Sequence, residues 1–153
     1  MTGYMFDTNV FNDIVDSNID ISSLADGPTL YATHIQVDEI RKTPDEERRV
    51  RLEELFSEIP QESVPTESMI WDVSRWGKSK WSDGELLSGI RQRLVGFGGR
   101  DESNDEDALL ADIAINKGFI LVTHDRCLYR VVTEFGGAAC NLEHLLVLAQ
   151  KDA

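Results

Sequence analysis

The stretch YMFDTNVFND, residues 4–13, joins a short apolar segment to a helical pattern through one carboxylate. Gly3 to Phe6 is short and apolar, which predicts a central strand, and residues 9–15 have the apolar spacing of a helix. Asp7 stands where that strand ends. It is either a helix cap, a common use of Asp at such turns, or a carboxylate directed at a site beside the sheet.

The remainder of the chain repeats this alternation of strand and helix. Further strands are predicted at residues 29–32, 62–64 and 119–123, and the last of these, FILVT, is apolar throughout and therefore buried on both faces. Capping signals predict helix starts at Thr33, Thr43 and Ser103. Other helical patterns cover residues 67–76, 83–95, 125 onward and 141–150. The alternation predicts an α/β fold around a mostly parallel sheet.

The length and the charge of the chain limit what it can be. Its 153 residues fit one domain, so we expect a single domain over residues 1–153. The net charge of −13 argues against loose, charge-driven binding to nucleic acid, because phosphates would be repelled. No apolar run approaches the roughly 20 residues that span a bilayer, and the N-terminus lacks a signal-peptide pattern. We therefore expect a cytoplasmic protein without membrane contact.

One segment departs from the acidic character of the chain. Residues 75–100 hold six basic residues and only two acidic ones, interleaved with Trp76, Trp81 and Phe97. We interpret residues 68–101 as a basic, tryptophan-bearing insertion within the domain. The segment is either a solvated face over packed tryptophans or a surface that contacts RNA. If it contacts RNA, the candidate substrate-binding residues are Arg75, Lys78, Lys80, Arg91 and Arg93.

Four acidic residues are candidates for one site. Asp7 and Asp125 each follow an apolar strand, and the carboxyl ends of neighbouring parallel strands meet at one edge of a sheet. Glu39 and Asp107 lie on predicted helices that can reach the same edge. Clustered carboxylates need a cation, and an all-oxygen ligand set favours Mg²⁺ or Mn²⁺. Such ions activate water in phosphodiester hydrolysis, so the sequence points to that chemistry.

Each of these acids has a competing interpretation. Asp125 also stands where it can cap a helix. Glu39 has Asp38 beside it, and the helical period puts only one of them on the site face. We favour Glu39.

The acids before and within DALLADIA need the same sorting. A capping box opened by Ser103 assigns Glu106 to the helix backbone, and Asp105 then suits the helix dipole. That leaves Asp107 for the site. Asp112 is about 140° further round the helix, so we expect it to be solvated or salt-bridged.

The ordered motifs resemble those of the PIN-domain family over essentially the whole chain. They are FDTNV, the acid in THIQVDEI, DALLADIAI and FILVTHD. The resemblance implies a three-layer α/β/α fold and a nuclease that depends on divalent metal and acts mostly on RNA. The family's metal-binding acids fall on Asp7, Glu39, Asp107 and Asp125. Its residues that orient this site fall on Asn9 and Thr123.

The resemblance also suggests partners and a function. VapC-like toxins are the nearest small members, which implies an antitoxin protein as partner and a homodimer as a further expectation. The expected function is a divalent-metal-dependent endoribonuclease with Mg²⁺ or Mn²⁺, as a free enzyme or as the toxin of a toxin–antitoxin pair. The alternative is a non-catalytic RNA-binding or protein-interaction module. The long basic segment and Asp112, which replaces a small residue, depart from the toxin pattern.

Overall fold

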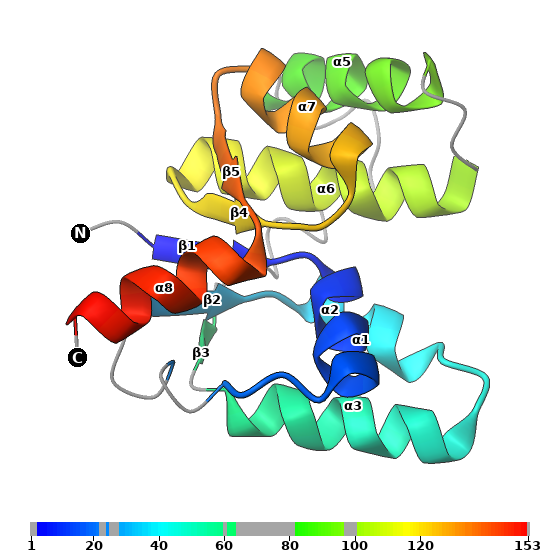
Figure 1. The fold of residues 1–153 in the computed structure, drawn as a ribbon. Helices are drawn as coiled ribbons and strands as arrows, with labels where there is room; N and C mark the ends of the chain where they lie inside the picture. Colours follow the sequence, from blue (N-terminus) through cyan, green and yellow to red (C-terminus); the bar gives the residue numbers. More distant parts are fainter. Residues whose placement is uncertain are drawn as a thin grey trace.

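The computed structural model describes residues 3–21, 24, 28–59, 61–63, 82–96 and 101–152. Strands and helices alternate along the chain, as the sequence predicts (Figure 1). The elements are β1 (Gly3–Phe6), α1 (Thr8–Ser17), β2 (Thr29–Ala32), α2 (His34–Arg41), α3 (Glu46–Glu58), β3 (Gln61–Ser63), α5 (Ser82–Gly96), α6 (Asp101–Lys117), β4 (Ile120–Val122), α7 (Arg126–Glu134), β5 (Ala138–Cys140) and α8 (Leu142–Asp152).

The five strands form one sheet in the order β3-β2-β1-β4-β5. Every neighbouring pair is parallel, which confirms the mostly parallel sheet. β1 is central, and Phe6 pairs in register with Val122 of β4. The chain leaves β1 toward β2 on one side, while β4 lies on the other side. The carboxyl ends of β1 and β4 therefore form a topological switch point, where open α/β sheets place their sites.

Helices cover both faces of this sheet, which gives the three layers visible in Figure 1. Met5 and Leu121 point into a core with α5, α6 and α7. Phe6 and Val122 point into the opposite core with α1, α3 and α8. Alternate residues of one strand thus enter different cores, because successive side chains of a strand face opposite ways. α2 contributes to both cores, consistent with a position at the end of the sheet.

Helix starts follow the predicted capping signals at one place and depart from them at two. At Thr33 the capping box is present: its hydroxyl accepts from the Ile35 N–H, and Gln36 Oε1 accepts from the Thr33 N–H at 2.7 Å. The predicted start at Thr43 is wrong, because Asp45 caps α3 by accepting from the N–H groups of Glu47 and Arg48. An Asp directly before the first turn satisfies two backbone donors at once, which outweighs a Pro-based start two residues earlier.

The other departures concern α6 and the last strand. α6 begins at Asp101 rather than after Ser103, so Ser103 lies inside the helix and the capping box predicted there is wrong. β5, of sequence AAC, is a strand that the sequence did not predict. Its residues are small and lack apolar alternation, and pairing with β4 makes it a strand.

Of the predicted insertion, the structure describes α5, which packs in the core with α6 and α7. The helix predicted at residues 67–76 lies outside the described residues.

Across the part of the chain that the structure describes, no helix is both long enough and apolar enough to cross a bilayer.

Candidate acidic active site

The switch point between β1 and β4 carries two of the predicted acids. Asp7 directly follows β1, and its N–H donates to the Val122 carbonyl at 2.9 Å, which continues the ladder between the strands. Thr123 follows β4 and donates its hydroxyl to Asp7 Oδ2 at 2.9 Å. The same hydroxyl oxygen accepts from the Asp125 N–H at 3.0 Å. The neighbouring strands thus bring Asp7 and Asp125 to one place, as the sequence analysis expected of adjacent strands.

Asp7 is a buried carboxyl whose charge is disfavoured. Its exposed fraction is 1%. Burial is the main reason that its pKa rises from 3.8 to about 6; the Thr123 hydrogen bond opposes this rise and the charge of Asp125 adds to it. Asp7 holds the N-cap position of α1, yet its side chain makes no cap hydrogen bond there, although the nearby N–H groups of Thr8 and Asn9 lower its pKa. The helix-cap interpretation therefore does not account for this residue.

Asp125, by contrast, does cap a helix. Its Oδ1 accepts from the N–H groups of Cys127 at 2.8 Å and Leu128 at 3.2 Å, at the start of α7. These two bonds hold the carboxylate in one orientation. Its charge still reaches the other acids, because it raises the pKa values of both Asp7 and Asp107. Asp125 therefore both caps α7 and belongs to the acidic cluster.

Glu39 reaches the cluster from α2. Its Oε1 accepts a hydrogen bond of 3.0 Å from the hydroxyl of Thr8, the residue after Asp7. The pKa of Glu39 rises from 4.5 to about 8, mainly because of burial and then because of Glu106, with smaller contributions from Asp7 and Asp107 and an opposing one from Thr8. Asp38 is exposed and lines a groove instead. α2 therefore presents Glu39, rather than Asp38, to the other acids.

Asp107 reaches the cluster from α6. Its pKa rises from 3.8 to about 8, mainly because of burial and then because of the charges of Asp7, Asp125 and Glu106. Glu106 is not a helix cap: its Oε1 accepts from Lys42 Nζ at 2.6 Å, across from α6 to the end of α2. Asp112 accepts from Asn116 one turn on, and its charge is not among those that raise the pKa values of Asp7, Glu39 and Asp107. Five charges from β1, α2, α6 and α7 thus influence one another.

Two buried side chains that the sequence analysis did not select support this cluster. Thr8 is 5% exposed and holds Glu39, as described above. Gln36 is fully buried and donates from Nε2 to the Phe6 carbonyl at 3.1 Å, which ties α2 to the end of β1. The predicted orienting residue Asn9 is exposed, and within the described residues no hydrogen bond joins its side chain to the four acids. Thr8 and Asn9 are both polar and both follow Asp7, so the sequence alone does not indicate which of the two side chains turns toward the acids.

The predicted substrate-binding cations divide into two groups. Arg75, Lys78 and Lys80 lie outside the described residues. On α5, Arg93 donates from Nε to Glu134 of α7 at 2.9 Å, and Arg91 is half-buried. The positive charge of Arg93 is therefore paired with the carboxylate of Glu134.

A groove opens beside the acidic cluster, between α2 and α6. Its volume is about 320 Å³. Lys42 and Glu106 lie along it as the ion pair described above. The residues that line it are Ile35, Asp38, Arg41, Lys42, Glu106 and Leu109. Because Glu106 lines this groove and its charge raises the pKa values of Glu39 and Asp107, the groove adjoins the cluster.

The chemistry of the cluster suits a hard cation. Its donors are carboxylate and hydroxyl oxygens, the ligand type of Mg²⁺ and Mn²⁺. Burial and then the neighbouring negative charges raise the pKa values of Asp7, Glu39 and Asp107, and a bound dication would favour their charged forms. Within the described residues, no three His, Cys, Asp or Glu side chains are arranged closely enough to hold a metal ion as they stand. The acids therefore fit the ion by donor type and charge, and binding would require side-chain rotation.

Comparisons with known proteins bear on the fold. No protein-family model and no curated protein matches the sequence. Among solved structures, a chain of VapBC2 from Rickettsia felis, bound to a DNA fragment from the promoter, is 19% identical, with a TM-score of 0.58 over 92% of this chain and 98% of that one. PAE2754 from Pyrobaculum aerophilum is 18% identical, with a TM-score of 0.55 over 98% of this chain and 90% of that one. The chain therefore has the PIN-like α/β fold of these structures, as its motifs predicted.

Proposed function

We propose that this protein is a divalent-metal-dependent endoribonuclease whose site is the acidic cluster. The observation that carries the proposal is the convergence of charge: Asp7, Glu39 and Asp107 come from three elements, and burial together with the other acids raises all three pKa values. A cluster that disfavours its own charges costs folding free energy, which is typical of functional sites. The sheet topology supports the proposal, because Asp7 and Asp125 follow the neighbouring strands β1 and β4 at the switch point, where sites of open α/β sheets form.

The residues of the cluster have distinct roles in this proposal. Asp7, Glu39, Asp107 and Asp125 would hold one or two Mg²⁺ or Mn²⁺ ions. Such an ion, when bound, activates water and stabilises the charge that develops on the phosphate. The hydroxyls of Thr8 and Thr123 hold the carboxyls of Glu39 and Asp7 in place, because each donates a hydrogen bond to its partner. Supporting hydrogen bonds of this kind set the orientation and the basicity of metal ligands.

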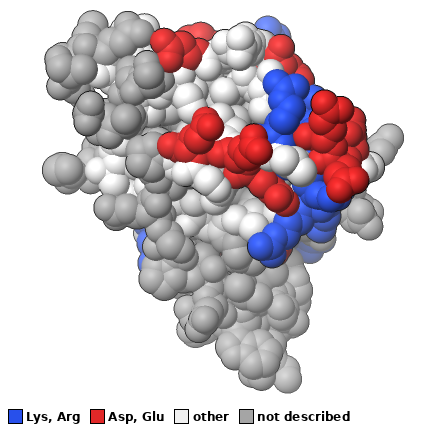
Figure 2. Space-filling view, turned by 90° about the horizontal axis from the view of Figure 1, so that it is seen from below, with Lys and Arg blue, Asp and Glu red and all other residues white. Residues whose placement is uncertain are grey.

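RNA would have to approach a protein of net charge −13. The surface that carries α3 should attract RNA only weakly, because acidic and basic side chains are mixed among the residues coloured in Figure 2. The groove between α2 and α6 adjoins the cluster, but its cations Arg41 and Lys42 are balanced by Asp38 and Glu106. We therefore expect phosphate contacts mainly from the cations proposed in the 75–80 segment.

The site proposal is tested by a matched pair of variants on α6. Asp107→Asn removes an acid of the cluster, whereas Asp112→Asn removes an acid that is bonded to Asn116 outside it. We expect Asp107→Asn and Asp7→Asn to lose Mg²⁺-dependent cleavage of RNA, and Asp112→Asn to retain it. Manganese should raise the melting temperature of the wild type and of Asp112→Asn only. Equal cleavage by Asp107→Asn and the wild type would rule out this site.

The PIN-like fold also motivates a partner. Because the similar VapBC2 chain was solved in a VapBC2 assembly on DNA, we propose that this protein is the toxin of a pair and is silenced by an antitoxin protein. Co-expression with the product of an adjacent small gene tests this, with inhibition of RNA cleavage as the readout. A purified complex that still cleaves RNA at the full rate would contradict it. The homodimer and the cytoplasmic location remain predictions.

A further inference from the structure

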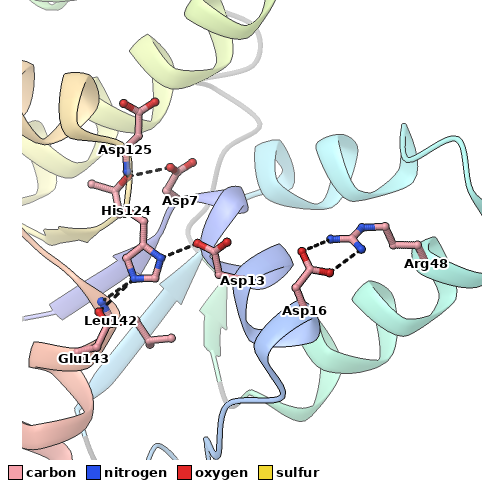
Figure 3. Close-up of polar contacts among 9 residues, drawn as sticks. Asp7, Asp13, Asp16, Arg48, His124, Asp125, Leu142 and Glu143 are labelled. Carbon is pink, nitrogen blue, oxygen red and sulfur yellow. Dashed lines mark hydrogen bonds and ion pairs between the residues drawn. The ribbon is translucent and has the colours of Figure 1, made fainter.

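A second polar cluster lies beside the acidic site and has no role in the function proposed above. His124 stands between Thr123 and Asp125, and its ring is directed away from Asp7 (Figure 3). Its Nδ1 lies 2.5 Å from Asp13 Oδ2 on α1. Its Nε2 lies 3.3 Å from the Leu142 N–H at the start of α8. One imidazole therefore links the β4–α7 loop to two helices that are distant in sequence.

The contacts of the ring identify the hydrogen bond that matters. Because the Leu142 N–H donates to Nε2, that nitrogen is an acceptor, and the ring proton then sits on Nδ1 and points to the Asp13 carboxylate. Glu143 Oε2 also lies 3.3 Å from Nε2, but with the proton on Nδ1 it makes no hydrogen bond to the ring, and Glu143 is 69% exposed. The ring is 25% exposed, and the bond to Asp13 is charge-assisted.

The loop that His124 holds is the one that connects the acids of the site. Thr123 donates to Asp7, and its N–H is bonded to the Cys140 carbonyl. The Asp125 N–H donates a hydrogen bond to the Thr123 hydroxyl oxygen. His124 lies between Thr123 and Asp125, so a rotation of its backbone would move both the hydroxyl that is bonded to Asp7 and the neighbouring carboxylate of Asp125.

We propose that His124 is a positioning residue: its hydrogen bonds to Asp13 and to the Leu142 N–H hold residues 122–125 between α1 and α8 and so keep Thr123 and Asp125 beside Asp7. The purpose of this positioning rests on the proposed function, whereas the positioning itself is a property of the metal-free chain. Through the bond between His124 and the Leu142 N–H, this role would connect the site to α8, a helix that contributes none of the four acids.

The test is amide hydrogen exchange by NMR on the metal-free protein. His124→Ala should speed exchange at the Thr123 and Asp125 amides about tenfold, the equivalent of one lost hydrogen bond, while α3 is unchanged. His124→Asn, whose side-chain amide can donate to Asp13 as Nδ1–H does, should restore most of the protection. The Mn²⁺ affinity, measured by electron paramagnetic resonance without RNA, should weaken about tenfold in His124→Ala and recover in His124→Asn.

A matched control lies one turn further along α1. Asp16 Oδ1 accepts from Arg48 at 2.8 Å and joins α1 to α3, without contact to the loop (Figure 3). Asp16→Ala should leave the Thr123 and Asp125 amides protected. If His124→Ala does not fold, Asp13→Ala removes the same bond at a residue that is 44% exposed, and it should reproduce the local exchange.

The possible results separate this inference from the proposed function. Unchanged exchange at the two amides, equal acceleration across the whole chain, or a His124→Asn variant no better than His124→Ala would each overturn the positioning role. If the wild type binds no Mn²⁺, the proposed function fails, and the exchange measurement still decides the role of His124.

Discussion

The hydroxyl of Thr123 donates to Oδ2 of Asp7 across the junction of β1 and β4, at 2.9 Å. Both groups are almost fully buried, with exposed fractions of 2% for Thr123 and 1% for Asp7. The bond favours the charged form of a carboxyl that burial disfavours. One hydroxyl thus partly offsets the unfavourable burial of the central acid and orients it at the same time.

Replacing Thr123 by Val is expected to disturb both functions of this hydroxyl. The change keeps the shape but leaves Asp7 Oδ2 and the Asp125 N–H without their partner. We expect the pKa of Asp7 to rise further, the stability to fall by about 1–3 kcal/mol, and the Mn²⁺ affinity to weaken by about 10–100-fold. Urea unfolding and manganese titration measure these effects. Thr123→Ser, which keeps the hydroxyl, should remain close to the wild type, and a Ser variant as weak as Val would contradict the explanation.

The metal-free protein is expected to lose stability as the pH rises. Asp7, Glu39 and Asp107 have folded-state pKa values of about 6, 8 and 8, above their ordinary values of 3.8, 4.5 and 3.8. Between these limits the folded state holds protons that the unfolded state has released, so the contribution of these three acids to stability is full below about pH 4 and is lost as the pH rises through about pH 8. For Asp7 alone, a rise of this size corresponds to about 3 kcal/mol. Urea unfolding in a chelator at a series of pH values measures the decline.

The control for this decline is Asp7→Asn, which cannot ionise. Its stability should fall less steeply between about pH 4 and pH 6 than that of the wild type. Saturating Mn²⁺ should stabilise the wild type most at the alkaline end, because metal ions bind the deprotonated carboxylates. A flat profile for the wild type in chelator would show that burial and the neighbouring charges do not raise the pKa values of these acids in the folded state.

Glu106 is expected to tune the acids next to it. Its charge is the second-largest cause of the raised pKa of Glu39 and also contributes at Asp107. Glu106→Gln should therefore lower both pKa values, and Lys42→Met, which removes the cation paired with Glu106, should raise them. Carboxyl titration by carbon-13 NMR measures both changes. Asp112→Asn on the same helix serves as the control, and an equal shift in that variant would mean that the effect is general rather than local.

The start of α2 is expected to depend on Thr33. Thr33→Ala removes the hydroxyl that accepts from the Ile35 N–H and contacts the buried Gln36. We expect a loss of about 1–2 kcal/mol in urea unfolding, the usual cost of losing an N-cap. Thr43→Ala, at the start that the sequence suggested for the next helix, should change stability by less than about 0.5 kcal/mol, because Asp45 is the cap there. The reverse order of the two losses would contradict the capping assignments.

The local features of this site were predictable because they arise within short segments. The apolar stretches at residues 3–6, just before Asp7, and 119–123, just before His124 and Asp125, indicate strands directed at one edge, and the structure pairs these strands directly. The capping box at Thr33 sets the phase of α2, and that phase turns Glu39 rather than Asp38 toward the acids. Periodicity and caps depend on neighbours a few residues apart, so the sequence carries them.

Contacts between distant segments were not predictable from the sequence. Glu106 fits a capping box in sequence, yet it pairs with Lys42, because α6 begins earlier and its side chain meets the end of α2. Thr8, rather than Asn9, turns inward to Glu39 once α1 packs beside α2.

The sequence by itself determined the alternation of strands and helices, and it offered four acids as candidates for one site, since buried runs, helical periods and carboxylates are local properties of the chain. Only the tertiary structure decided which polar groups support those acids. Asp13 and His124 are 111 positions apart, and a hydrogen bond of that separation exists only after the sheet has brought β4 beside β1 and the helices have packed around it. The supporting contacts depend on packing, and packing is a property of the whole fold.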